Sequence, residues 1–147
     1  MQVMVVYDTQ YGNTERIAWA IGEAVGGMVL KVAKATLTDL KMCGILIIGS
    51  PMHGGWFTEG IRDLLQTSPA LEGVNVAVFD TRTRRSLFGF ASPRISRSII
   101  KNGGKLLAPP EGFIVQGIKG PLREGELERA AAWAKLLLQG CQERTTG

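Results

Sequence analysis

The chain has 147 residues, of which 45% are hydrophobic and 20% are charged, and its formal net charge is +4 with a pI near 9.3. This length suits one domain with its own core, and the composition excludes a disordered or fibrous chain. Apolar runs such as 45–48 are too short to cross a bilayer, so we expect no membrane association. Two cysteines and a single histidine form neither a disulfide framework nor a metal motif.

Apolar runs alternate with amphipathic patterns, which predicts βαβ units around a parallel sheet. Strands are expected at about residues 2–7, 28–34, 44–50, 74–79 and 113–116, and residues 105–107 are either an additional strand or the start of one. Helices are expected at about residues 13–26, 57–67, 91–102 and 124–139, with a short one near 36–41. The pattern therefore predicts an α/β fold, a doubly wound sheet of about five parallel strands with helices on both faces.

No internal repeat or linker interrupts this pattern, so we expect residues 1–142 to form one domain and 143–147 a polar tail. Cys43 precedes a buried-strand pattern and is expected to be inert in or near the core, whereas Cys141 is expected in a frayed tail. The chain starts with a strand pattern and no basic or apolar leader, which favours a free-standing cytoplasmic protein.

The most informative segment joins the first strand to the first helix and reads Thr9-Gln10-Tyr11-Gly12-Asn13-Thr14-Glu15. The first amides of a helix have no intrahelical acceptor and carry partial positive charge, so they attract anions. Gly12 permits close approach of the backbone, while Thr9, Asn13 and Thr14 offer side-chain donors. No Lys or Arg lies within the segment, which argues against a nucleoside triphosphatase and favours one phosphate monoester.

The alternative for this segment is a plain helix cap, with Thr9 or Asn13 as the N-cap residue. Against it, a cap needs one such side chain, whereas three surround a glycine directly after a strand.

The same segment resembles the phosphate loop of the flavodoxin family, in which a hydroxyl residue and two variable positions precede Gly-Asn-Thr-Glu. The matching residues are Thr9, Gly12, Asn13, Thr14 and Glu15. The resemblance implies the strand order 2-1-3-4-5 and a noncovalently bound flavin mononucleotide, FMN, whose 5′-phosphate lies on this loop. In such sheets the ligand sits beyond the carboxyl ends of the strands, so the loops after the first, third and fourth strands would form the site.

The loop after the third strand resembles the family's second flavin-binding loop. Its candidate contacts are Ser50, Pro51, Met52, His53, Gly54, Gly55 and Trp56. The resemblance implies that His53 packs on the inner ring face and that Gly54 offers a backbone hydrogen bond to the reduced ring nitrogen N5. The alternative for His53 is an ordinary surface or packing residue of the loop. Trp56 either covers the ring edge or fixes the following helix to the sheet.

The loop after the fourth strand corresponds to the family's third flavin-binding loop, with Asp80, Thr81 and Arg82 as the candidate contacts to the ring. The tyrosine that often stacks on the outer ring face is missing. Phe88, Phe90 or an arginine plane replaces it, or that face stays open.

Basic residues dominate the segment from Thr81 to Pro110, which contains no Asp or Glu. They are Arg82, Arg84, Arg85, Arg94, Arg97, Lys101 and Lys105. If these cations lie together beside the ring, their field would steer an acidic redox partner or NAD(P)H to it; otherwise they are solvated helix faces. Charge alone would also allow nucleic-acid binding, but no recognisable module is present, so we expect none.

Three functions remain open from the sequence. The first is an electron carrier that shuttles electrons between protein partners through FMN and needs no catalytic side chain. The second is an NAD(P)H-dependent FMN reductase of quinones or other small acceptors, although the chain lacks the insertions that build substrate pockets in such enzymes. The third is a flavin-free signalling domain of the receiver type, for which Asp8 alone does not provide the required acidic cluster.

Overall fold

The computed structural model describes residues 2–36, 39–40, 43–52, 57–66, 71–83 and 92–146. The strands are β1 (Val3–Tyr7), β2 (Met28–Lys31), β3 (Ile45–Pro51), β4 (Asn75–Thr83), β5 (Lys105–Leu106) and β6 (Glu111–Val115). The helices are α1 (Asn13–Val25), the 3₁₀ turn η1 (Val32–Lys34), α3 (Glu59–Gln66), α4 (Ser92–Lys101) and α5 (Glu126–Thr146). Part of the short helix expected at 36–41 falls outside the described residues.

The strands form one parallel sheet in the order β2-β1-β3-β4-β5, and β6 also pairs with β4. The fifth position is split, because β5 pairs with Asn75 and Val76 at the start of β4 while β6 pairs with residues 79–83 at its end. The expected doubly wound α/β sheet with the order 2-1-3-4-5 is therefore confirmed. Of the two alternatives for residues 105–107, an additional strand is the one observed, as β5.

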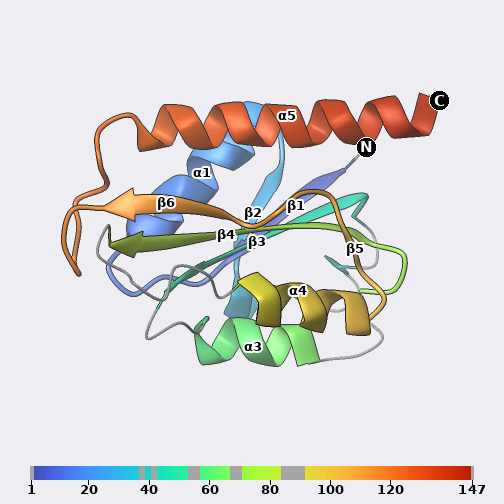
Figure 1. The fold of residues 1–147 in the computed structure, drawn as a ribbon, viewed down its shortest axis with the longest axis horizontal. Helices are drawn as coiled ribbons and strands as arrows, with labels where there is room; N and C mark the ends of the chain where they lie inside the picture. Colours follow the sequence, from blue (N-terminus) through green and yellow to red (C-terminus); the bar gives the residue numbers. More distant parts are fainter. Residues whose placement is uncertain are drawn as a thin grey trace.

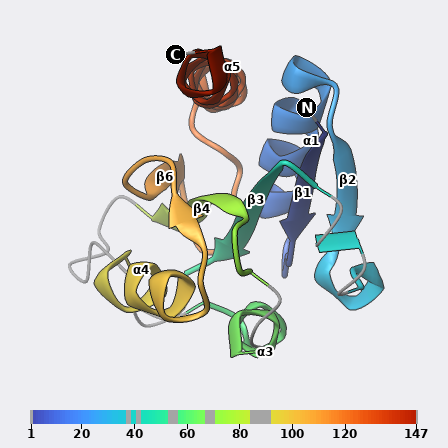
Figure 2. The same cartoon turned by 90° about the vertical axis from the view of Figure 1, so that its right-hand side faces the viewer.

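Helices cover both faces of the sheet, with α1 and α5 on one side and α3 and α4 on the other (Figures 1 and 2). Each face has its own core because alternate residues of a strand point to opposite sides. Val5, Ile47 and Phe79 belong to the core under α1 and α5, whereas Val6 and Ile48 belong to the core under α3 and α4. Trp133 packs against the first of these cores, since its ring lies edge-on to those of Phe79 and Phe113.

Two strands differ in length from the prediction because strand length follows the available partner. β2 was expected to reach residue 34 but ends at Lys31, which pairs with Tyr7, the last residue of β1; η1 follows. β4 was expected to end at residue 79 but runs to Thr83, because β6 supplies hydrogen-bonding partners there.

The last helix also exceeds the prediction, which ended it near residue 139 and placed a polar tail at 143–147. α5 continues to Thr146, and Cys141, expected in a frayed tail, is only 5% exposed and packs in the core beside Leu137. This burial anchors the last turns of the helix, and Gln139 adds a hydrogen bond to Glu143. Cys43 is buried as predicted, and both thiols are free.

A buried carboxylate fixes the start of α5 to β6. Glu126 is 2% exposed and accepts hydrogen bonds from the Ile114 amide at 2.7 Å, from Arg123 at 3.0 Å and from Arg129 at 2.7 Å. Arg129 also reaches Glu111 at 2.8 Å. Burial alone would raise the pKa of Glu126, but the hydrogen bonds from Arg129, the Ile114 amide and Arg123 outweigh it and lower the pKa to about 2.

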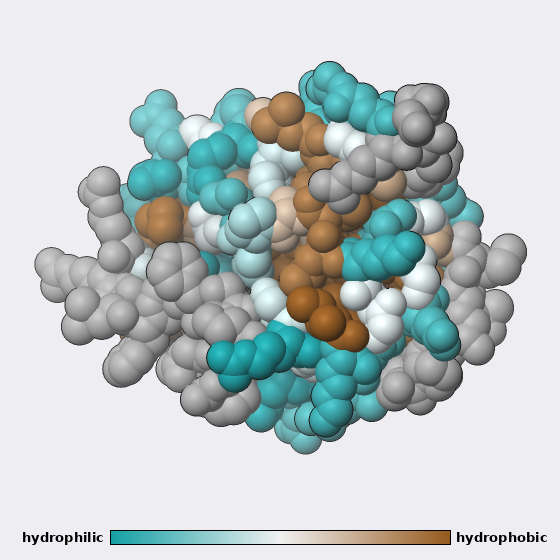
Figure 3. All heavy atoms as spheres, turned by 45° about the vertical axis from the view of Figure 1, so that its right-hand side comes forward, coloured by the Kyte–Doolittle hydropathy of each residue, from teal (hydrophilic) through white to brown (hydrophobic). Residues whose placement is uncertain are grey.

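An apolar strip runs over the face that carries β5 and the C-terminal part of α5 (Figure 3). A groove there is lined by Leu107, Ala108, Trp133, Leu136, Leu137, Gly140 and Cys141. Within the described ranges, no helix has the length and apolar character needed to span a membrane.

We expect Glu126→Gln to lower the free energy of unfolding by about 3 kcal/mol near pH 7, because it leaves two arginines facing a neutral amide. Since the folded pKa of Glu126 lies below its ordinary value of 4.5, its contribution is present above that value and is lost as the pH falls toward about 2. Urea denaturation at several pH values measures this.

The matched control is Glu128→Gln, which removes an exposed carboxylate from the same first turn of α5 and should change stability by less than about 0.5 kcal/mol. A difference between Glu126→Gln and the unmodified chain that stays constant down to pH 2 would contradict the assigned role of Glu126.

Candidate phosphate-binding site

The loop from β1 to α1 presents the start of the helix without a side-chain cap. The N-cap residue is Gly12, which has a φ of +89°, and no side chain in the described ranges caps α1. The Thr9 hydroxyl instead accepts a hydrogen bond from the Gly12 amide at 2.9 Å, one residue before the helix. The interpretation that Thr9 or Asn13 is an ordinary N-cap is therefore wrong, and the amides of Asn13 and Thr14 keep their capacity to bind an anion.

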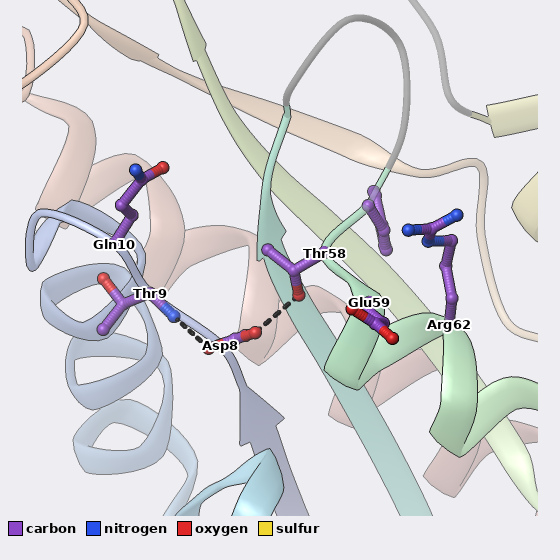
Figure 4. A pocket seen from close by; sticks show the side chains of 7 residues that line it. Asp8, Thr9, Gln10, Thr58, Glu59 and Arg62 are labelled. Carbon is purple, nitrogen blue, oxygen red and sulfur yellow. Dashed lines mark hydrogen bonds between the residues drawn. The ribbon is translucent and has the colours of Figure 1, made fainter.

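Asp8 fixes the base of this loop to the neighbouring elements (Figure 4). Its amide donates to the Gly49 carbonyl at 3.0 Å, which continues the pairing of β1 with β3. One carboxylate oxygen accepts the Thr9 amide at 2.9 Å, and the other accepts the Thr58 hydroxyl at 2.6 Å. The first loop and the start of α3 are thus held together by one side chain.

Thr14 connects the same loop to the end of β4. Its hydroxyl lies 2.8 Å from that of Thr81, and the two residues are 1% and 5% exposed. The predicted candidates Thr14 and Thr81 are therefore brought into contact, although the strands they adjoin are separated by β3. When Thr81 donates in this pair, the Thr14 hydroxyl retains its own proton for a further acceptor.

The described candidate residues of the second loop, Ser50, Pro51 and Met52, form hydrogen bonds with neighbouring elements of the protein or with each other. Ser50 is buried, and its hydroxyl accepts the Thr58 amide at 3.0 Å and donates to the Pro51 carbonyl at 2.9 Å. The Met52 amide donates to the Thr81 carbonyl at 3.0 Å. These bonds fix the exit of β3 against β4. His53, Gly54, Gly55, Trp56 and Phe88 lie outside the described residues.

At the end of β4 the structure contains a buried ion pair. Asp80 and Arg82 lie on the same side of the strand, and the Arg82 Nε donates to the Asp80 carboxylate at 2.6 Å with a second bond from Nη2. Gly112 makes room for the guanidinium, because a Cβ at this position would lie 2.6 Å from Nε. Burial raises the pKa of Asp80, and the bonds from Arg82 offset only part of that rise.

The expectation of an uncompensated basic cluster at the ring edge is wrong in two respects. Arg82 is neutralised by Asp80, which lies just before the acid-free segment. Lys105 pairs with Asn75 at the start of β4, so it lies at the opposite end of the sheet from the loop after Thr83 (Figure 1). The cations follow one another in the sequence but are separated in space, because α4 carries the chain from the carboxyl ends of the strands back toward their amino ends.

A pocket of about 570 Å³ opens between the first loop and α3 (Figure 4). Its lining residues are Asp8, Thr9, Gln10, Phe57, Thr58, Glu59 and Arg62. Only Thr9 and Gln10 were predicted as site residues. Asp8 directly follows β1, and the other four lie at or just before the start of α3; their position after the carboxyl ends of neighbouring strands was the available signal. Among the described residues, no three His, Cys, Asp or Glu side chains gather to hold a metal ion.

No family model and no curated protein matches the sequence, but solved structures match the fold. An archaeal flavodoxin has a TM-score of 0.76 at 18% identity, over 97% of this chain and 99% of its own. Flavodoxin 2 from Bacillus cereus has a TM-score of 0.78 at 21% identity, over 95% and 99%. The rubredoxin oxygen:oxidoreductase of Desulfovibrio gigas has a TM-score of 0.79 at 15% identity, over 99% of this chain and 37% of that protein. The chain therefore has the flavodoxin-like fold.

We expect Gly12→Ala to lower the free energy of unfolding of the ligand-free protein by about 1–2 kcal/mol. The added Cβ meets no atom within 4 Å, so the cost comes from the left-handed backbone conformation alone. Chemical denaturation measures it. Gly140→Ala is the control, because Gly140 also has open space but lies inside α5, where alanine should be neutral or stabilising. Equal effects of the two substitutions would contradict the strained start of α1.

Proposed function

We propose that this protein binds one FMN noncovalently and shuttles electrons between redox partners. The observation that carries the proposal is the start of α1, which follows β1 through a left-handed Gly12 and is left uncapped. A protein normally satisfies the first amides of a helix with a side chain, and leaving them open at the carboxyl edge of a sheet suits an anionic ligand. The flavodoxin-like fold supports FMN as that ligand.

The residues around the loop fit a phosphate monoester. The amides of Asn13 and Thr14 lie at the positive end of the helix, and the hydroxyls of Thr9 and Thr14 are placed beside them. Neutral donors of this kind bind a phosphate that stays in place, without the lysine that a transferred phosphoryl group requires. Gln10 and Tyr11 form the exposed rim of the same loop.

Bound flavin would supply the redox chemistry, and the protein would bind and orient it. Asp8, Ser50 and Thr58 hold the first and second loops in a fixed relation, while Met52 and Thr81 join the second loop to the end of β4. These bonds would preorganise the walls on either side of the ring. The roles proposed for His53, Gly54, Gly55, Trp56 and Phe88 rest on the resemblance in sequence.

An acidic redox protein is the partner that we favour. The net charge is +4, and Arg97 and Lys101 are exposed on α4, with Lys105 following it in β5. A basic surface raises the rate of encounter with an acidic protein and does so less at high salt. A cytoplasmic location is part of this proposal, in keeping with two free thiols.

The alternative is an NAD(P)H-dependent FMN reductase of quinones or other small acceptors. The pocket of about 570 Å³ next to the first loop favours it, since it is large enough for a small acceptor beside a bound flavin. Steady-state oxidation of NADPH with a quinone by the FMN-loaded protein distinguishes the two. Turnover without any protein partner would favour the reductase, and its absence would favour the carrier.

We expect the purified protein to bind FMN in a fluorescence titration and to bind riboflavin more weakly. Thr14→Val should weaken the binding of FMN by about 1.5–3 kcal/mol, because it removes a hydrogen-bond donor to a charged group. The same substitution should change the binding of riboflavin little. Thr81→Val is the control, since it breaks the same buried hydroxyl pair but keeps the Thr14 hydroxyl. Equal affinity for FMN and riboflavin in the unmodified protein would refute a phosphate site on this loop.

A further inference from the structure

The first loop has an unfavourable charge for the ligand proposed above. Asp8 lies before it and Glu15 lies in the first turn of α1, and no Lys or Arg lies between them. The Glu15 carboxylate is fixed nearby because it accepts a hydrogen bond from the Tyr7 hydroxyl. A phosphate dianion on this loop would therefore lie between two carboxylates, and the helix dipole offers only about half an elementary charge against them.

A cation reaches the loop from a distant part of the sequence. The segment 116–125 connects β6 to α5, and the Lys119 ammonium lies over the Tyr11 ring, 5.9 Å from its centroid. The next residue, Gly120, packs against the Asn13 side chain so closely that a Cβ would lie 2.7 Å from Oδ1. Lys119 is thus placed against the loop by the backbone that follows it.

The segment that carries Lys119 is a tight, hydrogen-bonded turn. The Gly120 amide donates to the Gly117 carbonyl at 3.0 Å, and the Gln116 amide donates to the Pro121 carbonyl at 2.8 Å. Val115 and Leu122 form an antiparallel bridge at its base. The turn is fixed at both ends, so the position of Lys119 follows from the fold and not from a freely moving loop.

We propose that Lys119 supplies the positive charge that the β1–α1 loop lacks and binds the phosphate group of the ligand at the rim of that loop. This inference rests on the proposed function, because it takes FMN as the ligand. In the ligand-free protein the ammonium stacks on the exposed Tyr11 ring, which is a weak contact for a solvated cation and is readily exchanged for an anion. Lys119 would act on binding alone, with no role in electron transfer.

The test is the affinity for FMN and for riboflavin, measured by fluorescence titration at about 0.02 M and about 0.5 M salt, where screening differs several-fold. We expect Lys119→Met to lower the affinity for FMN about three- to tenfold at the lower salt concentration and much less at the higher one. Riboflavin, which has no phosphate, should bind Lys119→Met and the unmodified protein equally. Inorganic phosphate should compete with FMN less well in Lys119→Met.

Two control variants remove one positive charge elsewhere. Lys105 lies at the opposite end of the sheet, so Lys105→Met should leave the affinity for FMN unchanged within about twofold. Arg16→Met removes the exposed cation in the first turns of α1. The inference would be overturned if Lys119→Met left the affinity for FMN unchanged, or if it lowered the affinities for FMN and riboflavin equally. It would also be overturned if Arg16→Met, and not Lys119→Met, removed the salt dependence of FMN binding. Absence of FMN binding by the unmodified protein would overturn the proposed function itself, so the two failures are distinguishable.

Discussion

The connection between β1 and α1 is the structural constraint on which the proposed binding site depends. It leaves the sheet at Tyr7, turns through Gly12 with a positive φ, and begins the helix with amides that no described side chain caps. Those amides either bind water or bind an anion, since the sheet and helix fix their direction. The described residues of this edge are arranged around that point, because the ends of β3 and β4 and the start of α3 are hydrogen-bonded to it or to each other.

Short polar side chains carry that arrangement. Asp8 joins the first loop to Thr58, and Thr14 joins it to Thr81. Each bond links segments that are distant in sequence, so a change in the first loop would affect both the start of α3 and the end of β4. The buried Asp80–Arg82 pair adds a charged group to this edge without adding net charge. The local field therefore depends on side chains that come from outside the three loops.

Periodicity was enough to predict a parallel α/β sheet with helices on both faces, since alternating apolar strands and amphipathic helices allow few topologies. The strand order came from the resemblance of the first loop to the flavodoxin family. The length of β4 was missed because it depends on pairing with β6, which no local pattern reports. α5 runs past its expected end because Cys141 is buried by tertiary contacts that override a polar local sequence. Strand alternation would have placed Asp80 and Arg82 on one side, but only the close approach of Gly112 shows that they pair.

The first loop could be singled out from Thr9, Gly12 and Thr14, because strand, glycine and hydroxyls in that order have a local physical meaning; its role in binding stays a prediction. The contact of Lys119 with this loop could not be predicted, since more than a hundred residues separate Lys119 from Tyr11 and the turn at Gly120 brings them together. Local chemistry therefore indicated the candidate loop, whereas its electrostatic surroundings depended on the folded chain.

The most direct measurement is an amide-resolved NMR titration of the ligand-free protein with FMN and then with riboflavin. The account predicts that the amide protons of Asn13 and Thr14 move strongly downfield with FMN, as they donate to a phosphate, and that riboflavin does not reproduce this. If FMN left these two signals in place while perturbing another face of the molecule, the start of α1 would not be the binding site.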